Sequence, residues 1–150
     1  MIESDASGTG SFIGAAADYD ITGTTTVQRY LVKYDLVGDR KFHLISSPVA
    51  SQAIQTEFVT TIPTEGHDFY SFSETTNMWI NTKQGTSPDF IWNDSFEDNF
   101  IVGKGYLVAY PDNVTKNFTG TLNSIEVAKS CSYTAGNGLG WNLLGNPFPS

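Results

Sequence analysis

Residues 69–80 read FYSFSETTNMWI, and this stretch decides the fold class. Tyr70 and Phe72 stand two positions apart, which is the spacing of side chains on one face of a β-strand. The polar run Glu74-Thr75-Thr76-Asn77 has the composition of a turn, and Met78-Trp79-Ile80 resumes an apolar run. Two short strands joined by this turn predict an antiparallel β-hairpin.

Strand patterns continue on both sides of this hairpin. Alternation and short apolar runs predict further strands over 27–34, 41–49, 100–110, 118–122, 125–131 and 141–143. The segment 100–110 is the longest of them, and its Gly103 and Gly105 suggest a bulge or a close backbone approach. Helix-like spacing is best at residues 51–61, where Pro63 stops any helix early.

About eight to ten short strands with Gly, Pro and Asn between them predict an all-β fold. We expect an antiparallel β-sandwich of jelly-roll-like form, with at most one short helix near 51–61. Residues 1–24 are predicted to be a flexible lead-in or an edge strand. Residues 25–150 are predicted to form a single sandwich module.

Two segments of the chain resemble one another. Residues 42–51 read FHLISSPVAS and residues 141–150 read WNLLGNPFPS, and in both a Leu and an aliphatic residue precede a Pro. The similarity suggests a duplicated module, so that residues 140–150 are the first strand of a second repeat. Chance similarity between two strands that end at a Pro is the alternative. On the first interpretation the chain is a piece of a larger protein.

The composition excludes several classes of function. Sixteen Asp and Glu against eight Lys and Arg give a net charge of −8, and only 16% of the residues are charged. Nucleic-acid binding needs grouped Lys and Arg, so no nucleic-acid partner is expected. No run of 18 apolar residues occurs, so we expect no membrane insertion. The single Cys131 forms no disulfide within the chain, and its strand-like context predicts a buried position.

Signatures of catalysis are weak. His43 and His67 are the only histidines, and the strand pattern around them favours structural roles. No Gly-x-Ser-x-Gly nucleophile elbow occurs. A pair of carboxylates at glycosidase spacing would arise easily by coincidence among sixteen acids. We therefore predict a protein that is not an enzyme and requires no cofactor.

Calcium is the one metal that the sequence suggests. The segment 93–99 reads NDSFEDN, and its Asp94, Glu97 and Asp98 supply the oxygen ligands that calcium prefers. A solvated loop is the competing interpretation and the one that we favour.

Aromatic side chains in the middle of the chain suggest a binding function. Sugar rings stack on flat aromatic faces, while amide and carboxylate groups bond their hydroxyls. We predict such a sugar site from six residues, namely Trp92, Trp79, Phe90, Tyr70, Asn93 and Asp94. The competing interpretation is a core position, which the pattern favours for Trp79 and Trp141. For Trp92, in the loop-like segment 85–93, the two interpretations are balanced.

Four segments carry a resemblance to a known group of proteins. They read FHLISSPVAS (42–51), YSFSETTNMWIN (70–81), GKGYLVAYPDNVTKNFTGTLN (103–123) and GWNLLGNPFPS (140–150). In this order they resemble a repeated β-rich region of secreted and surface proteins of Bacteroidota that are exported by type IX secretion. The resemblance implies a secreted or cell-surface location within a larger protein. It implies no catalytic motif.

Two functions follow as expectations. The first is a non-catalytic extracellular module that binds a polysaccharide or cell-surface glycan, or contributes to adhesion. The second is a structural spacer that packs against neighbouring domains of the same chain and has no ligand of its own.

Overall fold

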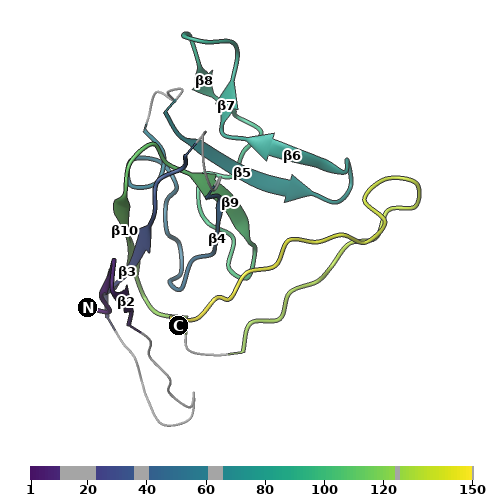
Figure 1. Cartoon of the computed structure of the whole chain (residues 1–150). Coiled ribbons are helices and arrows are strands. Elements are labelled where there is room, and N and C mark those ends of the chain that lie inside the picture. The colour runs from purple at the N-terminus through teal and green to yellow at the C-terminus, as the bar shows by residue number, and fades with distance from the viewer. Residues whose placement is uncertain (11–22, 36–40, 61–65, 124–125, 150) are drawn as a thin grey trace.

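The fold is all-β, as the sequence predicts. The computed structural model describes residues 1–10, 23–35, 41–60, 66–123 and 126–149. These residues form ten strands and no helix (Figure 1). The strands are β1 (Ser4–Asp5), β2 (Gly8–Thr9), β3 (Thr25–Leu31), β4 (His43–Ile45), β5 (Asp68–Ser73), β6 (Met78–Asn81), β7 (Lys83–Gln84), β8 (Ile91–Trp92), β9 (Tyr106–Ala109) and β10 (Val114–Gly120).

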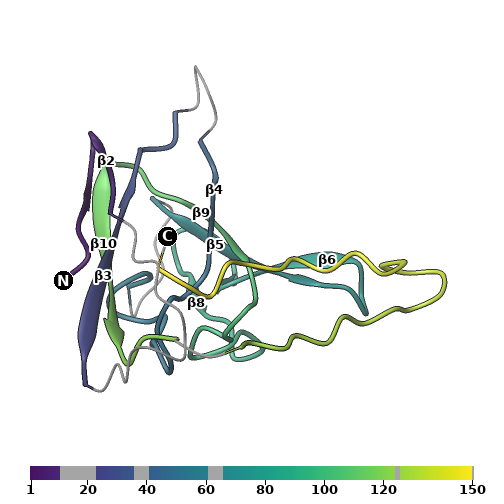
Figure 2. The same ribbon diagram turned by 90° about the horizontal axis from the view of Figure 1, so that it is seen from below.

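The strands pair in antiparallel fashion throughout. β3 pairs with β10 from Leu31 opposite Val114 to Thr25 opposite Gly120. A second sheet has the order β4-β9-β5-β6, and two shorter pairs are β1–β2 and β7–β8. Figure 2 shows the β3–β10 pair on one side of the molecule and the β5–β6 hairpin projecting away from it. Within the described residues no helix has the length and hydropathy needed to cross a membrane.

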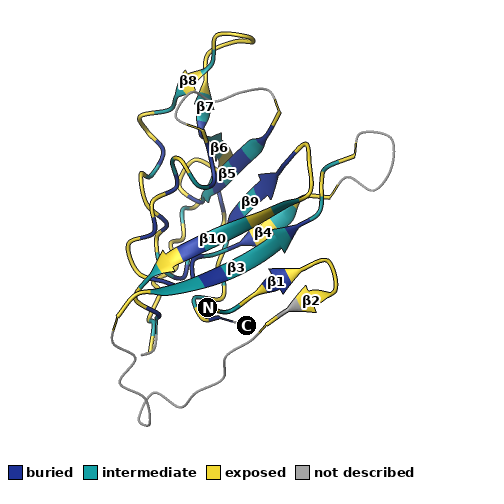
Figure 3. Cartoon of the chain, turned by 90° about the vertical axis from the view of Figure 1, so that its left-hand side faces the viewer, coloured by how far each residue is buried: buried dark blue, intermediate teal, exposed yellow. Residues whose placement is uncertain are grey.

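One hydrophobic core joins the two larger sheets. Val27 of β3 lies opposite Phe118 of β10, and neither side chain is exposed. From the second sheet, Phe69 and Tyr106 are also completely buried. Phe100 contacts both groups, with ring centroids 5.2 Å from Phe118 and 5.7 Å from Phe69. Figure 3 shows β9 buried over most of its length. The finer prediction of a jelly-roll-like sandwich stays a prediction.

The one candidate helix is a loop over its described residues, 51–60. Its backbone is hydrogen-bonded to the segment 98–100 instead of to itself in a helical pattern. Ile54 N–H donates to the Asp98 carbonyl at 2.9 Å, and Phe100 N–H donates to the Gln52 carbonyl at 2.8 Å. Thr56 adopts a φ of 72°, which a helix does not allow. The helix-like spacing of Ile54 and Phe58 therefore reflects their shared burial in the core.

The long strand predicted over 100–110 is shorter than expected. Only Tyr106–Ala109 form β9, and the chain turns through 101–104 before it. Gly103 has a φ of 77°, and a Cβ on Gly105 would lie 2.9 Å from Leu143 Cγ. The close backbone approach expected at these two glycines is thus present, and it lies just before β9, so the strand begins only at Tyr106.

Residues 126–149, which we call the arm, contain no strand. The strands predicted over 125–131 and 141–143 are therefore wrong for every residue described there, and Ile125 lies outside the described residues. The arm leaves the body, runs beside the β5–β6 hairpin and returns (Figures 1 and 2). On its return it forms an isolated bridge between Leu144 and Lys104.

The two similar segments lie next to each other in the structure. The Ser46 hydroxyl donates to the Asn146 carbonyl, and Asn123 Nδ2 donates to the carbonyls of both Ser47 and Pro147. Only the first segment contains a strand, β4.

Residues 1–10 lie along β3. Ile2 N–H donates to the Thr26 carbonyl at 2.9 Å, and Gln28 N–H donates to the Ile2 carbonyl at 2.8 Å. Strands β1 and β2 then form a short hairpin. Residues 11–22, which make up half of the predicted lead-in, lie outside the described residues.

Candidate functional site

Three aromatic side chains form one cluster on the β5–β6 hairpin. The ring of Trp79 contacts Phe72 at 5.4 Å and Tyr70 at 6.4 Å between centroids, both in T-shaped geometry. Trp79 is 46% exposed, and the other two rings are half-buried. We call Tyr70, Phe72 and Trp79 the aromatic face.

The strand register explains why these rings meet. Phe72 lies directly opposite Trp79, and Tyr70 lies opposite Asn81. Side chains alternate between the two faces of a strand, so all four point to the side away from buried Phe69 and Ser71. The turn that sets this register is the predicted one, with Asn77 at a φ of 54°, a conformation that Asn tolerates.

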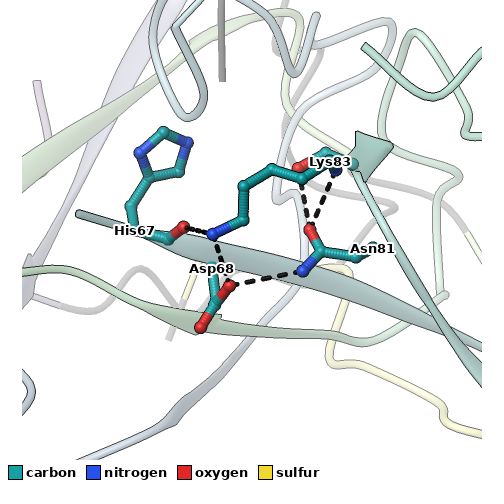
Figure 4. A network of polar contacts seen from close by, with 5 residues as sticks. His67, Asp68, Asn81 and Lys83 are labelled. Atoms are coloured by element: carbon teal, nitrogen blue, oxygen red, sulfur yellow. Dashed lines mark hydrogen bonds and ion pairs between the residues drawn. The ribbon is translucent and has the colours of Figure 1, made fainter. Parts of the chain in front are cut away.

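A polar network continues the aromatic face along the same hairpin (Figure 4). Lys83 Nζ lies 2.8 Å from Asp68 Oδ1 and donates to the His67 carbonyl at 2.7 Å. Asn81 Nδ2 donates to Asp68 Oδ1 at 3.3 Å. Because each group is held by another, the network presents polar atoms in fixed positions beside the rings.

The Tyr70 hydroxyl connects the rings to this network. The Asn81 side chain and the Asp68 carboxylate lie close enough to it to influence its pKa. Burial, followed by the negative charge of Asp68, raises the pKa of the Tyr70 hydroxyl above its ordinary value. The hydroxyl is therefore protonated at neutral pH and can donate a hydrogen bond.

Of the six predicted sugar-site residues, the structure brings Trp79 and Tyr70 together. Trp92 packs against the core instead, with its ring 6.0 Å from that of Phe96. Phe90 lies under the Lys83 ammonium group, 5.2 Å from Nζ to the ring centroid. Both side chains therefore lie outside the aromatic face, Phe90 against Lys83 and Trp92 against Phe96.

The remaining two predicted residues, Asn93 and Asp94, lie in the loop after β8. Asn93 Nδ2 donates to the Asn81 carbonyl at 2.9 Å, and Asn93 Oδ1 accepts from Ser95 N–H at 3.0 Å. Asn93 thus fixes the backbone next to the network. Asp94 is exposed on the same loop.

The predicted calcium ligands do not converge. Glu97 forms an ion pair with Lys104. Asp94 and Asp98 are exposed, and the Asp98 carbonyl is occupied by Ile54 N–H. Among the described residues no group of three His, Cys, Asp or Glu side chains is placed to hold a metal.

Two side chains expected in the core are exposed. Trp141 is 76% exposed on the arm, and Cys131 is exposed there as a free thiol. Trp79 is the third departure, since the pattern favoured burial for it. In each case strand-like spacing predicts an inward-facing side chain, but the arm forms no strand and Trp79 lies on the outer face of its sheet.

Comparison with known proteins shows the family. A family model described as a domain of unknown function, DUF8693, matches residues 6–150. The chain belongs to this family. No curated protein and no solved structure matches the chain.

The two histidines of this DUF8693 chain lie in structural surroundings. His43 Nε2 is 2.8 Å from the Val32 carbonyl oxygen. His67 stacks on Tyr110 at 6.3 Å, and burial followed by the charge of Lys83 lowers the pKa of its imidazole. The ring is therefore neutral at pH 7, inside the protein rather than at the aromatic face.

Sequence reasoning missed three residues near the aromatic face of the DUF8693 chain. Phe72 shares a strand face with Tyr70, and this spacing could have placed it in the site. Glu74 and Thr134 are hydrogen-bonded partners sixty positions apart, a relationship that no local pattern signals.

Proposed function

We propose that this chain is a non-catalytic carbohydrate-binding module and that the aromatic face of the β5–β6 hairpin is its site. The observation that carries the proposal is the half-exposed Trp79 ring, packed in T-shaped contact with Phe72 and Tyr70. With 46% of its surface exposed, Trp79 offers solvent an apolar aromatic surface. The apolar C–H face of a sugar stacks on such a surface.

The network beside the rings supports the same function. The Tyr70 hydroxyl, the Asn81 amide and the Asp68 carboxylate supply donors and acceptors at one edge of the aromatic face. Sugar hydroxyls both donate and accept, so they require this mixture of partners. Lys83 fixes Asp68, which limits how far the carboxylate can turn away from the ligand.

The proposal includes a location outside the cell. Its supports are the resemblance to secreted and surface proteins of Bacteroidota and the predominance of Ser, Thr and Asn over charged residues, 41 against 24. A polysaccharide or a cell-surface glycan is the partner, and no chemical step follows binding.

Affinity gel electrophoresis against plant and algal polysaccharides tests the function. We expect at least one polymer to retard the wild-type chain, and Trp79→Ala to abolish the retardation. Phe42→Ala is the matched control, because Phe42 is also an exposed aromatic residue, 40% exposed, but precedes β4 at the other edge of the sheet. Equal retardation of wild type and Trp79→Ala would show that the polysaccharide does not bind at the aromatic face.

A structural spacer is the second candidate, and a groove elsewhere in the chain favours it. Residues of β3, β4 and the arm enclose about 320 Å³, and the lining includes Leu44, Leu144 and Phe148. All three side chains are exposed, and apolar residues gathered around a groove mark contact surfaces. A neighbouring domain of the same chain would fill this groove. Leu44→Ser would then weaken binding of that domain and leave polysaccharide binding unchanged.

A further inference from the structure

The tip of the arm, residues 132–142, is fastened to the turn of the β5–β6 hairpin by one carboxylate. Glu74 Oε1 accepts from Thr134 N–H at 2.6 Å and from Gly140 N–H at 3.0 Å, while Oε2 accepts from the Thr134 hydroxyl at 2.8 Å. The Asn137 amide adds a bond to the Thr75 carbonyl at 3.0 Å. These bonds hold the arm tip beside the turn.

The fit between tip and turn is also steric. Gly138 lies against the Glu74 backbone, and a Cβ at this position would overlap the Glu74 carbonyl oxygen. The glycine therefore permits a close approach that any other residue would block. Glu74 itself is buried, so its carboxylate interacts with the arm tip and not with solvent.

This docking places two further exposed aromatic residues, both on the arm, at the turn of the hairpin that carries the aromatic face. Trp141 is 76% exposed and follows Gly140, which is bonded to Glu74. Tyr133 is 71% exposed and precedes Thr134, which is bonded to the same carboxylate. Trp79 lies opposite Phe72, two positions before Glu74. One carboxylate thus fixes the backbone next to both arm residues, at the turn that follows the aromatic face in the chain.

Apart from the Asp68–Lys83 ion pair and buried Glu74, the combined surface carries no charge. Residues 75–82 and 130–149 contain no Asp, Glu, Lys, Arg or His, although the whole chain has a net charge of −8. Small hydroxyl and amide side chains separate the aromatic residues, among them Ser132, Thr134, Asn137 and Asn142. Separated rings among uncharged polar groups match a chain of neutral sugars better than they match the continuous apolar core of a protein interface.

We propose that the arm tip is the second half of the glycan site and that the ligand is an uncharged polysaccharide chain. One sugar stacks on Trp79, and sugars further along the chain stack on Trp141 and Tyr133. The arm thereby makes the site selective for long chains over short ones. This inference rests on the proposed function, because it extends the site centred on Trp79.

The test uses the whole chain and two series of ligands. Affinity electrophoresis compares neutral polymers (hydroxyethyl cellulose, xyloglucan, galactomannan) with anionic ones (alginate, polygalacturonate). Titration calorimetry then compares short and long oligosaccharides of the polymer that binds. We expect neutral polymers alone to retard the chain. Trp141→Ala should weaken binding of the long oligosaccharide about tenfold and binding of the shortest one less than about twofold.

Matched variants separate the arm from the rest of the site. Gly138→Ala should reproduce the effect of Trp141→Ala, because the added methyl group displaces the tip. Gly8→Ala is its control, since a Cβ on Gly8 meets no atom within 4 Å. Because Trp141 is exposed, Trp141→Ala should melt at the wild-type temperature.

The possible outcomes distinguish this inference from the proposed function. If Trp79→Ala abolishes binding but Trp141→Ala and Gly138→Ala bind long chains as wild type does, the inference fails and the proposed function stands. If no polymer retards the wild-type chain, both fail. Binding to anionic polymers alone would overturn the uncharged ligand. Self-association that Trp141→Ala abolishes, without any retardation, would assign the surface to a second copy of the chain.

Discussion

The Glu74 carboxylate accepts a hydrogen bond from the backbone N–H of Thr134, 2.6 Å away and sixty residues later in the chain. Glu74 lies in the turn after β5, and Thr134 lies at the tip of the arm. An arm without strands has few backbone bonds of its own to hold it against the body. Its position therefore depends on this carboxylate more than on pairing.

Replacement of Glu74 should release the arm tip. In Glu74→Gln the side chain loses its charge and one of its two acceptor oxygens, so the bonds to Thr134 and Gly140 weaken. Amide hydrogen exchange of Thr134 and Gly140 should become faster, while that of Phe69 in β5 stays as in wild type. Thr75→Ala is the control, because it removes a neighbouring side chain and leaves the carboxylate. Unchanged exchange in Glu74→Gln would show that the tip is held by other contacts.

Arm docking should also depend on pH. Burial raises the pKa of the Glu74 carboxyl, but hydrogen bonds from Gly140, Thr134 and Ser132 outweigh burial and leave the pKa below its ordinary value of 4.5. The docked state thus favours the carboxylate. The contribution of the ionised Glu74 carboxylate to docking is complete above the ordinary pKa. It is lost as the pH falls through the lowered pKa.

Exchange of the Thr134 and Gly140 amides, corrected for intrinsic rates, would follow this transition as the pH is lowered from about 6 to values below 4.5. We expect faster exchange only at the acidic end for wild type. Glu74→Gln should give a flat profile. A profile for wild type that is equally flat would contradict the assignment of Glu74 as the group that holds the arm.

The core prediction concerns Phe58. Its side chain is 1% exposed and contacts Phe100 at 4.8 Å and Phe118 at 4.6 Å between ring centroids. Phe58→Ala should lower the free energy of unfolding by about 4 kcal/mol, through lost burial and a new cavity. Phe58→Leu should cost about 1 kcal/mol. Chemical denaturation measures both, and a small loss in Phe58→Ala would mean that the loop 51–60 does not anchor the core.

The network beside the aromatic face should be sensitive to Lys83. Its side chain is 9% exposed and bridges Asp68 and the His67 carbonyl. Lys83→Met leaves both acceptors without this donor and should cost about 2 kcal/mol of stability. Lys33→Met, at an exposed position, should change stability by less than about 0.5 kcal/mol. Equal melting temperatures for the two variants would show that the network contributes nothing to stability.

The sequence predicts the parts of this fold that local patterns determine. The hairpin over 69–80 has alternating aromatic residues, a polar turn and an Asn that tolerates a positive φ, and the structure confirms it. All-β composition follows from the same kind of signal. The strands that fail, over 126–131 and 141–143, have apolar residues but form no ladder with another strand, and pairing is a property of the whole molecule.

The site is less predictable because it depends on which face of a strand is covered. The strand pattern favours the core for Trp79 and leaves Trp92 undecided, but Trp79 lies on an outer sheet face and Trp92 packs on Phe96. The contact between Glu74 and Thr134 is a tertiary relationship without a local signature. Spacing therefore identified the hairpin but could not choose among its aromatic residues.

Nuclear magnetic resonance of the three tryptophan indole groups tests the central claim most directly. Each indole N–H of Trp79, Trp92 and Trp141 gives its own signal, and Trp→Phe variants assign them. On titration with the neutral polymer that retards the chain, the account predicts that the signals of Trp79 and Trp141 shift and saturate together while that of Trp92 stays in place. A shift confined to Trp92, or no shift of Trp79, would contradict a glycan site on the aromatic face.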